Sequence, residues 1–305
     1  MPSRPLRIGT RGSPMALYQA GLVRDRLGAA HPGLAVELVP IRTTGDRVQT
    51  RQLAEIGGKG LFTKEIEEAL LDRRLDLAVH SLKDMETVLP EGLEIGAVLA
   101  RDDPRDAVIS RSGAGLADLP HGARVGTASL RRRAQLLRWR DDLEVVPIRG
   151  NVGTRLARLA GGEFDALVLA LCGLERLGKA ALVTEILAAE LMLPAVGQGA
   201  LAIECRAADP ALRQLLAPLN DPTSAACVAA ERAMLAALDG SCRTPIAGLA
   251  AIAGDRLSLD ALLLAPDGSA ERRDHIVGAI GDAVALGNEL GERLRRGAGP
   301  EFGFG

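Results

Sequence analysis

The hydrophobic positions near the N-terminus predict a strand, a helix and a second strand. Residues 6–8 (Leu-Arg-Ile) predict a short strand that runs into a Gly-Thr turn. Ser13 and Pro14 then open an amphipathic helix, because serine is a favoured N-cap and proline a favoured first helical residue. Residues 36–41 are apolar again and predict the second strand.

A polar stretch over residues 42–60 separates these elements from a helix over 63–72 and a strand over 75–80. The stretch is long for a connector inside a compact domain, so we expect a mobile lid or a disordered loop. It contains Gly57-Gly58-Lys59-Gly60, which is a weak signal for phosphate binding.

A related pattern returns in the middle of the chain. The strand and turn at 7–10 (Arg-Ile-Gly-Thr) are echoed at 124–127 (Arg-Val-Gly-Thr), and the helix and strand at 63–79 are echoed at 154–168. Chance similarity between β-α-β units is the alternative, but two landmarks recur in the same order. The repeat therefore favours two similar α/β lobes.

The last third of the chain has a different pattern. Asp221 and Pro222 begin an alanine-rich helix of roughly sixteen residues. Residues 257–265 and 272–277 flank a Pro-Asp-Gly turn and predict a hairpin, and residues 283–295 predict a final amphipathic helix. Together they indicate a small α+β domain.

Composition and charge narrow the classes of ligand. Hydrophobic residues make up 47% of the chain and aromatics only 2%, so few rings are available to stack on bases. The net charge is −2 despite 37 lysines and arginines, so a positive site must be local. We therefore expect a small anionic ligand and not a nucleic acid, whose binding proteins usually carry a basic excess. A membrane is not expected as partner either, because no apolar run approaches the roughly 18 residues of a membrane span. The N-terminus lacks the pattern of a signal peptide, which favours the cytoplasm.

The cysteines differ in their surroundings. No two have CxxC spacing, and with four scattered histidines no zinc site is expected. Cys172 and Cys227 lie in apolar or alanine-rich runs and are expected to be buried, whereas Cys205 is ambiguous. Cys242 lies in Gly-Ser-Cys-Arg-Thr-Pro, where the neighbouring arginine favours a thiolate, so it is a candidate reactive thiol.

Polar residues that follow the predicted strands are the other candidates, because ligands of α/β sheets bind beyond the carboxyl ends of strands. They are Arg11, Ser13, His80, Ser81, Lys83, Asp84, Thr127, Ser129, Arg131, Arg132, Arg133, Arg149, Asn151 and Arg155, with Gly150 between Arg149 and Asn151. Helix N-termini and arginines bind anions, so the group indicates a ligand with several carboxylates or phosphates. Neither GxxxxGK[ST] nor GxGxxG after a strand is present to favour phosphate.

Two of these interpretations have structural alternatives. The three arginines at 131–133 point about 100° apart in a helix, so not all can face one ligand, and a solvated helix face is the alternative. Asp84 lies beside Lys83 at the end of an apolar strand. It is either a counter-ion for the arginines or a carboxylate that stabilises a developing cation and transfers protons.

Seven segments taken together resemble the porphobilinogen deaminase (hydroxymethylbilane synthase) family. They are RIGTRGS at 7–13, GGKGLF at 57–62, VHSLKD at 79–84, GTASLRR at 126–132, RGN at 149–151, LPAVGQGA at 193–200 and the loop around Cys242. Each is modest alone, but the ordered set covers nearly the whole chain.

The resemblance implies a fold and a set of domains. It implies two α/β lobes like those of periplasmic binding proteins, joined by two hinge crossings, and a small α+β C-terminal domain. Domain 1 is expected over 1–99 and 197–218, domain 2 over 100–196, and domain 3 over 219–305.

The resemblance also implies a reaction. Four porphobilinogens are condensed head to tail with loss of ammonia on a dipyrromethane cofactor, and water then releases hydroxymethylbilane. The cofactor is expected on Cys242 through a thioether, in a cytoplasmic monomer without an obligate protein partner. A non-catalytic two-lobed cytosolic anion-binding protein is the alternative, although it has no use for Asp84 together with a reactive thiol.

The residue roles follow from the same resemblance. The expected catalytic residues are Arg11, Lys83, Asp84, Arg149 and Arg155. Those expected to bind the cofactor are Ser81, Lys83, Asp84, Thr127, Ser129, Arg131, Arg132, Gly150 and Cys242. Those expected to bind substrate are Arg11, Ser13, Gln19, Lys59, Phe62, Arg149, Arg155, Arg176 and Gln198. No metal ligand is expected.

Overall fold

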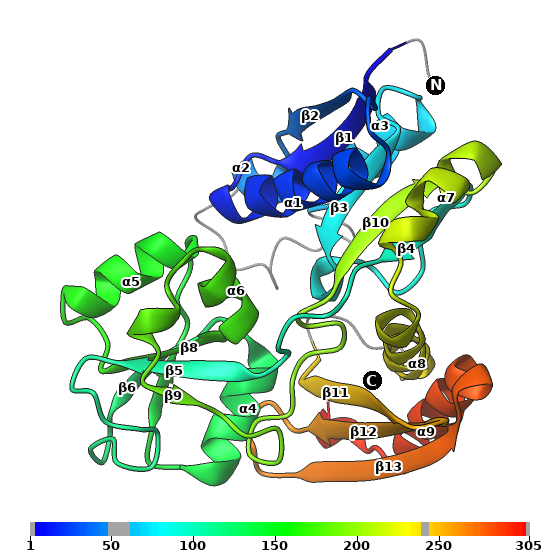
Figure 1. Cartoon of the computed structure of the whole chain (residues 1–305). Coiled ribbons are helices and arrows are strands. Elements are labelled where there is room, and N and C mark those ends of the chain that lie inside the picture. The colour runs from blue at the N-terminus through cyan, green and yellow to red at the C-terminus, as the bar shows by residue number, and fades with distance from the viewer. Residues whose placement is uncertain (1–3, 48–61, 239–243, 303–305) are drawn as a thin grey trace. The chain divides into compact units, whose positions relative to one another are not determined.

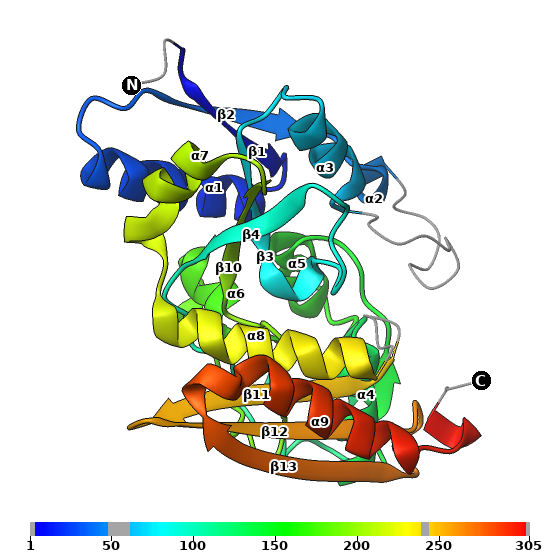
Figure 2. The same ribbon diagram turned by 90° about the vertical axis from the view of Figure 1, so that its right-hand side faces the viewer.

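The chain folds into two compact units in a computed structural model, which describes residues 4–47, 62–238 and 244–302. Unit 1 comprises Met1–Arg101 and Ala200–Ala225, and unit 2 comprises Asp102–Gly199 and Ala226–Gly305. Figures 1 and 2 show the elements of both units from two directions.

Unit 1 is built on a five-stranded sheet in the order β2-β1-β3-β10-β4. Its strands are β1 (Leu6–Arg11), β2 (Val36–Ile41), β3 (Leu77–Ser81), β4 (Leu93–Val98) and β10 (Leu201–Arg206). The first three are parallel, whereas β10 runs antiparallel to both of its neighbours. Helices α1 (Pro14–Ala30) and α7 (Pro210–Leu216) share a core with Leu77 and Val79, and α3 (Lys64–Leu71) shares a second core with Ala78. The alternation along β3 thus places helices on both faces.

Most local sequence signals in unit 1 predict the observed elements. The Ser13 side chain accepts a hydrogen bond from the Ala16 amide (3.3 Å), which starts α1 at Pro14 as predicted, and β2 has its predicted bounds. The prediction of an irregular loop over 42–60 is wrong at α2 (Thr44–Arg47). There the Thr44 amide and hydroxyl both donate to Glu65 of α3, at 2.8 and 2.5 Å, and this tertiary contact holds a helical turn. Residues 48–61, where the rest of the predicted lid falls, lie outside the described residues.

Unit 2 contains a second five-stranded sheet with the same pattern, in the order β7-β6-β8-β5-β9. Strands β7 (Glu144–Val146), β6 (Arg124–Gly126) and β8 (Ala166–Ala170) are parallel, and β5 (Asp106–Ser110) is antiparallel to β8 and to β9 (Glu185–Ile186). Helix α4 (Leu130–Trp139) packs on one face, and α5 (Val152–Ala160) and α6 (Leu171–Arg176) pack on the other. The matching order of the two sheets confirms the predicted pair of related lobes.

The remainder of unit 2 is a three-stranded antiparallel sheet with helices. Its elements are β11 (Ile246–Ala253), β12 (Arg256–Leu264), β13 (Glu271–Ala279), α9 (Ala283–Arg296) and the greater part of α8 (Pro222–Ala237). The predicted hairpin is confirmed by the pairing of Leu264 with Glu271. Strand β11 was not predicted, because its alanines and glycine carry little strand propensity. Short 3-10 turns lie at Ala180–Leu182, Ala217–Leu219, Ile280–Asp282 and Pro300–Phe302.

Helix α4 contacts both sheets of unit 2. Its Leu136 packs with Val125 and Val168 of the first sheet, and its Ala134 packs with Ala247 and Leu262 of the second. The turn after β12 lies against the same helix: a Cβ on Gly268 would stand 2.8 Å from the Ala134 carbonyl oxygen. The position of α4 is therefore fixed by the lobe and by the C-terminal sheet together.

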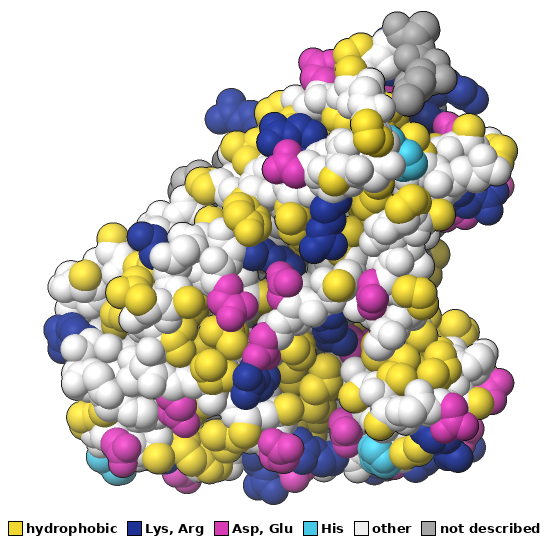
Figure 3. Space-filling model, viewed as in Figure 1, with side chains coloured by type: hydrophobic (Ala, Val, Ile, Leu, Met, Phe, Trp, Pro, Cys, Tyr) yellow, Lys and Arg dark blue, Asp and Glu magenta, His cyan; other side chains and the backbone are white. Residues whose placement is uncertain are grey.

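Four further properties bear on function. Among the described residues, no helix is long and apolar enough to cross a membrane, and no three His, Cys, Asp or Glu side chains are grouped to hold a metal ion. Cys172 and Cys227 are buried as predicted, and so is Cys205. Acidic and basic side chains are interspersed over the face of unit 2 that Figure 3 shows, as expected for a chain of low net charge.

Candidate active site

The carboxyl end of β3 presents the candidate acid. After Ser81 the chain forms a 3-10 turn, η1 (Leu82–Asp84), whose amide at Leu82 donates to the Ala200 carbonyl (3.0 Å). Leu82 and Met85 are buried on either side of the turn, whereas Lys83 is half-buried and Asp84 is exposed. Two buried anchors thus hold a short segment whose carboxylate faces solvent.

Neighbouring residues of unit 1 gather at the same edge of the sheet, since β1 and β3 are adjacent and parallel. Arg11 ends β1 and stacks over the Phe62 ring, with its guanidinium carbon 4.1 Å from the ring centroid. The buried Gln19 donates to the Ser81 hydroxyl (2.8 Å). Ser13 is the N-cap of α1. The structure therefore brings together the predicted residues of this half, apart from Lys59, which lies outside the described residues.

A buried polar cluster lies behind this edge, and of its members only His80 is among the candidates from the sequence. His80 of β3 is 2.9 Å from Glu204 of β10, and both side chains are buried. Glu67 of α3 is also buried, and burial together with the charge of Glu204 raises the pKa of Glu67. A glutamate inside the apolar run of β10 was the available signal for this cluster.

In unit 2, hydroxyl groups and arginines lie together at the start of α4. Thr127 accepts a hydrogen bond from the Ser129 amide (3.3 Å), and Ser129 caps the helix by accepting from the Arg132 amide (3.4 Å). The first turn then carries Arg131, Arg132 and Arg133. A side-chain hydroxyl that accepts from a backbone amide of the first turn is the usual N-cap of a helix, so the start of α4 is a regular helix N-terminus.

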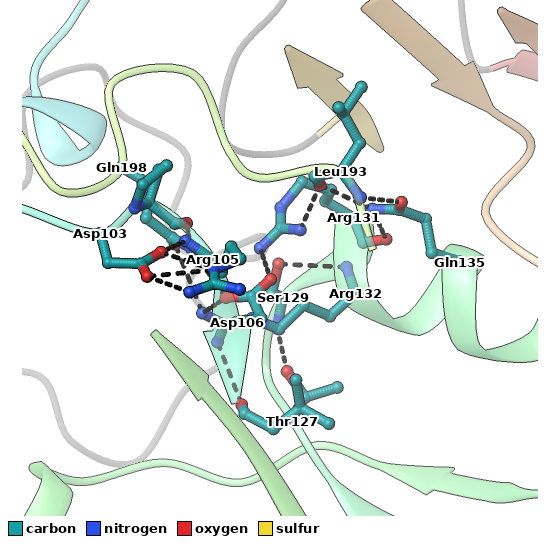
Figure 4. A network of polar contacts seen from close by, with 12 residues as sticks. Asp103, Arg105, Asp106, Thr127, Ser129, Arg131, Arg132, Gln135, Leu193 and Gln198 are labelled. Atoms are coloured by element: carbon teal, nitrogen blue, oxygen red, sulfur yellow. Dashed lines mark hydrogen bonds and ion pairs between the residues drawn. The ribbon is translucent and has the colours of Figure 1, made fainter. Parts of the chain in front are cut away.

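Two of these arginines share one buried carboxylate (Figure 4). Asp106 accepts from Arg131 through Oδ2 and from Arg132 through Oδ1, both at 2.7 Å. The exposed fractions are 4% for Arg131, 6% for Arg132 and 0% for Asp106, so the solvated-face alternative describes only Arg133. Burial by itself raises the pKa of Asp106, but the two arginine charges outweigh it and hold that pKa well below its usual value.

Gln198 belongs to the same cluster. Its amide nitrogen donates to Asp106 (2.8 Å) and to the Pro104 carbonyl (2.7 Å), and its oxygen accepts from Arg132 (3.4 Å). Gln198 has no exposed surface. Asp106 was not predicted as a site residue, although a charged residue that opens an apolar strand is a signal that could have found it.

The other predicted residues of unit 2 lie in two further contacts. Arg155 donates through Nε to the Gly150 carbonyl (2.8 Å), just after half-buried Arg149. Gly150 has φ +102°, a conformation that side-chain-bearing residues rarely adopt. Arg176 donates to Asp102 (2.8 Å) and to the Gly199 carbonyl (2.7 Å).

The cluster around α4 has the properties of a site for a carboxylate-bearing group. Two guanidinium groups face one carboxylate, which leaves a net charge of +1. Within the described part of the chain, the buried Nε atoms of Arg131 and Arg132 have no hydrogen-bond partner. Buried donors are nearly always paired, so the arginines have spare capacity for an anion. Cys242, the predicted attachment point, lies outside the described residues.

Solved structures of binding proteins resemble the chain at low identity. A TRAP periplasmic solute binding protein from Desulfovibrio salexigens is 11% identical, with a TM-score of 0.44 over 72% of this chain and 73% of that one. The alkanesulfonate-binding protein SsuA from Xanthomonas axonopodis pv. citri, bound to MOPS, is 17% identical, with a TM-score of 0.39 over 76% and 73%. The VFT2 domain of BvgS from Bordetella pertussis is 15% identical, with a TM-score of 0.41 over 69% and 84%.

Family profiles cover nearly all of the chain. The profile described as porphobilinogen deaminase, dipyromethane cofactor binding domain, matches residues 6–214. The profile of the porphobilinogen deaminase C-terminal domain matches residues 225–296. The first match includes the Asp84 turn and the arginine cluster, and the second begins within α8. The chain therefore belongs to the porphobilinogen deaminase family, and it carries that family's dipyrromethane cofactor-binding domain.

Proposed function

We propose that this chain condenses four porphobilinogen molecules head to tail and then releases hydroxymethylbilane by hydrolysis, as a transferase of tetrapyrrole biosynthesis. The observation that carries the proposal is the arginine pair at the start of α4, buried around a single carboxylate within the family's cofactor-binding domain. Each pyrrole of the substrate bears an acetate and a propionate, which such a site can pair.

We assign the binding roles by unit. In unit 2, Arg131 and Arg132 hold carboxylates of the dipyrromethane cofactor, assisted by Thr127, Ser129 and Gly150. The porphobilinogen carboxylates bind to Arg11 and Ser13 of unit 1 and to Arg149, Arg155 and Arg176 of unit 2. A charge-assisted hydrogen bond contributes about 1.5–3 kcal/mol, so several of them account for selection of a polycarboxylate. When bound, the cofactor supplies the free pyrrole carbon at which the chain begins.

Asp84 carries the acid–base chemistry in this proposal. The aminomethyl carbon of each porphobilinogen loses ammonia and becomes cationic. A carbon–carbon bond then forms to that carbon, and the attacked pyrrole carbon releases its proton. The exposed Asp84 carboxylate stabilises the cation and accepts hydrogen bonds from pyrrole N–H groups, because the 3-10 turn fixes it before reaction. The neighbouring Lys83 contacts the same anionic chain.

Cys242 is proposed as the covalent anchor, through a thioether formed as its thiol displaces ammonia from porphobilinogen. The other three cysteines are buried. Burial, with the nearby charges of Glu94 and Asp209, raises the pKa of Cys205 to about 11, which disfavours the reactive thiolate there. The positive neighbour Arg243 favours the thiolate at Cys242.

Intact mass spectrometry tests the proposal directly. Purified protein should carry the added mass of two pyrrole units on the peptide that contains Cys242, and Cys242→Ser should lack both the mass and turnover. Cys172→Ala is the matched control, because it removes a buried thiol and should keep the adduct. An unmodified but active wild-type protein would contradict the assignment of the cofactor.

The remaining assignments are proposed on the same basis. The domains are 1–99 with 197–218, 100–196 and 219–305, and the protein acts as a cytoplasmic monomer with no nucleic acid or membrane as partner. Light scattering after size exclusion should give the mass of one chain, 31.9 kDa plus the cofactor.

A further inference from the structure

The carboxylate between the two arginines has no assigned role in the reaction. We propose that Asp106 is a positioning residue: it holds Arg131 and Arg132 side by side in the geometry that receives the carboxylates of the dipyrromethane group. This inference rests on the proposed function. It concerns how the chain prepares the site before the group is attached.

The geometry shows why a fixed anion is needed there. Arg131 and Arg132 are adjacent in α4, and both guanidinium groups are buried. Two buried cations repel each other strongly, and each is unfavourable without a counter-charge. Asp106 gives one oxygen to each of them at 2.7 Å. Because each arginine meets a different oxygen, one carboxylate fixes the separation of both.

Asp106 is itself held by Gln198. The Gln198 amide nitrogen reaches both Asp106 and the Pro104 carbonyl, and its oxygen reaches Arg132. The resemblance predicted a substrate contact for Gln198, but its lack of exposed surface favours a brace for the aspartate. Gln198 therefore acts through Asp106 and Arg132.

The LPAVGQGA motif (residues 193–200), which contains Gln198, has a structural role in unit 2. The Leu193 carbonyl accepts from Arg131 (2.7 Å), and the Pro194 carbonyl accepts from the Gly248 amide of β11 (3.0 Å). The Gly197 amide donates to buried Glu231 of α8 (2.7 Å), whose other oxygen accepts from the Ala250 amide (2.8 Å). Residues 193–199 thus fasten the arginine cluster to the C-terminal sheet of the same unit.

The test uses full-length protein prepared without cofactor and then incubated with porphobilinogen. The rate at which the mass of two pyrrole units appears reports how well the site receives the group, independently of turnover. In Asp106→Asn, which keeps the shape and removes the charge, we expect this rate to fall at least tenfold while circular dichroism shows a folded chain. Asp106→Glu should recover part of the rate.

The matched control is Asp103→Asn. Asp103 lies three residues earlier and pairs with an arginine, Arg105, but does not touch the α4 cluster. Its attachment rate should stay within twofold of the wild type. If Asp106→Asn does not fold, Gln198→Met removes the brace and keeps the charge, and we expect a severalfold slower attachment.

A double variant distinguishes positioning from general stability. Because Asp106 acts through Arg132 as well as Arg131, adding Asp106→Asn to Arg132→Gln should slow attachment by a clearly smaller factor than it does in the wild type, since coupled residues are not additive. Full additivity, or a folded Asp106→Asn that gains the adduct within twofold of the wild-type rate, would overturn the inference. A wild type that never gains the adduct would instead refute the proposed function.

Discussion

At the scale of single residues, the position of Asp84 depends more on the packing of its neighbours in the chain than on contacts of its own carboxylate. Buried Leu82 and Met85 hold the turn, so replacing the carboxylate should leave the fold intact. We expect Asp84→Asn to lower kcat roughly 100- to 10,000-fold, the range for loss of a positioned acid–base group, with KM little changed.

Steady-state kinetics on the cofactor-bearing protein measures this effect. Asp25→Asn, which changes an exposed acid of unit 1 on α1, is the control and should retain wild-type rates. Turnover of Asp84→Asn at the wild-type rate would contradict the acid–base role.

Glu67 gives a prediction about pH. Burial, with the charge of Glu204, raises its pKa in the folded state above the ordinary 4.5, so the stability linked to its proton is present below about pH 4.5. That stability is lost as the pH rises through the folded pKa. The free energy of unfolding of Glu67→Gln, relative to wild type, should therefore increase between pH 4 and pH 7. Urea unfolding at both pH values measures it, with exposed Glu68→Gln as control.

Residue-scale prediction from sequence succeeded where the signal was local. Ser13 as an N-cap and Asp84 beside Lys83 at a strand end need only their neighbours in the chain. The sequence did not predict the buried pairs, because Asp106 contacts Gln198 and His80 contacts Glu204 across about a hundred residues of chain. Which carboxylate neutralises which cation is a property of the folded sheets.

At the scale of elements, the turn between β12 and β13 is one of the contacts that fix α4 from outside its own lobe. Gly268 has φ +79°, and its Cβ position is 2.8 Å from backbone atoms of Ala134 and Arg138. Alanine there combines backbone strain with a clash against a helix that cannot yield, so Gly268→Ala should destabilise by about 2–4 kcal/mol.

Gly254, in the turn before β12, provides the matched control. It also has positive φ (+63°), but no atom lies within 4 Å of its Cβ position. Gly254→Ala should destabilise by only about 1 kcal/mol, through backbone strain alone. The difference between the two variants in urea unfolding isolates the contact with α4, and equal losses would show that this contact contributes nothing.

Helices and strands are predicted correctly where the pattern of apolar residues and capping residues is clear. The bounds of β2 and the start of α8 after Asp221 follow from apolar runs and capping residues. Strand β11 has the sequence IAGLAAIA, which suits a helix as well as a strand, and only pairing with β12 makes it a strand. Helix α2 likewise depends on Glu65, a residue of another helix.

At the scale of the whole molecule, unit 2 joins two sheets that the sequence assigns to separate domains. Glu231 is a principal link, since its two oxygens accept the amides of Gly197 and Ala250. In Glu231→Gln one oxygen becomes a donor that faces a backbone N–H, so we expect a loss of about 1–3 kcal/mol in the free energy of unfolding. Glu271→Gln, at an exposed position of β13, should lose less than 0.5 kcal/mol.

The position of the antiparallel strand β10 also affects how the chain folds while it is being synthesised. It lies between β3 and β4 in the first sheet, yet it is encoded after the whole of residues 102–199. On a ribosome that adds about 5–20 residues per second, the first hundred residues wait roughly 5–20 s for their missing strand. During that interval β3 has an open hydrogen-bonding edge, which is where strands of separate chains associate. Nascent chains of this protein are therefore most exposed to aggregation, and to chaperone capture, before residue 206 leaves the exit tunnel.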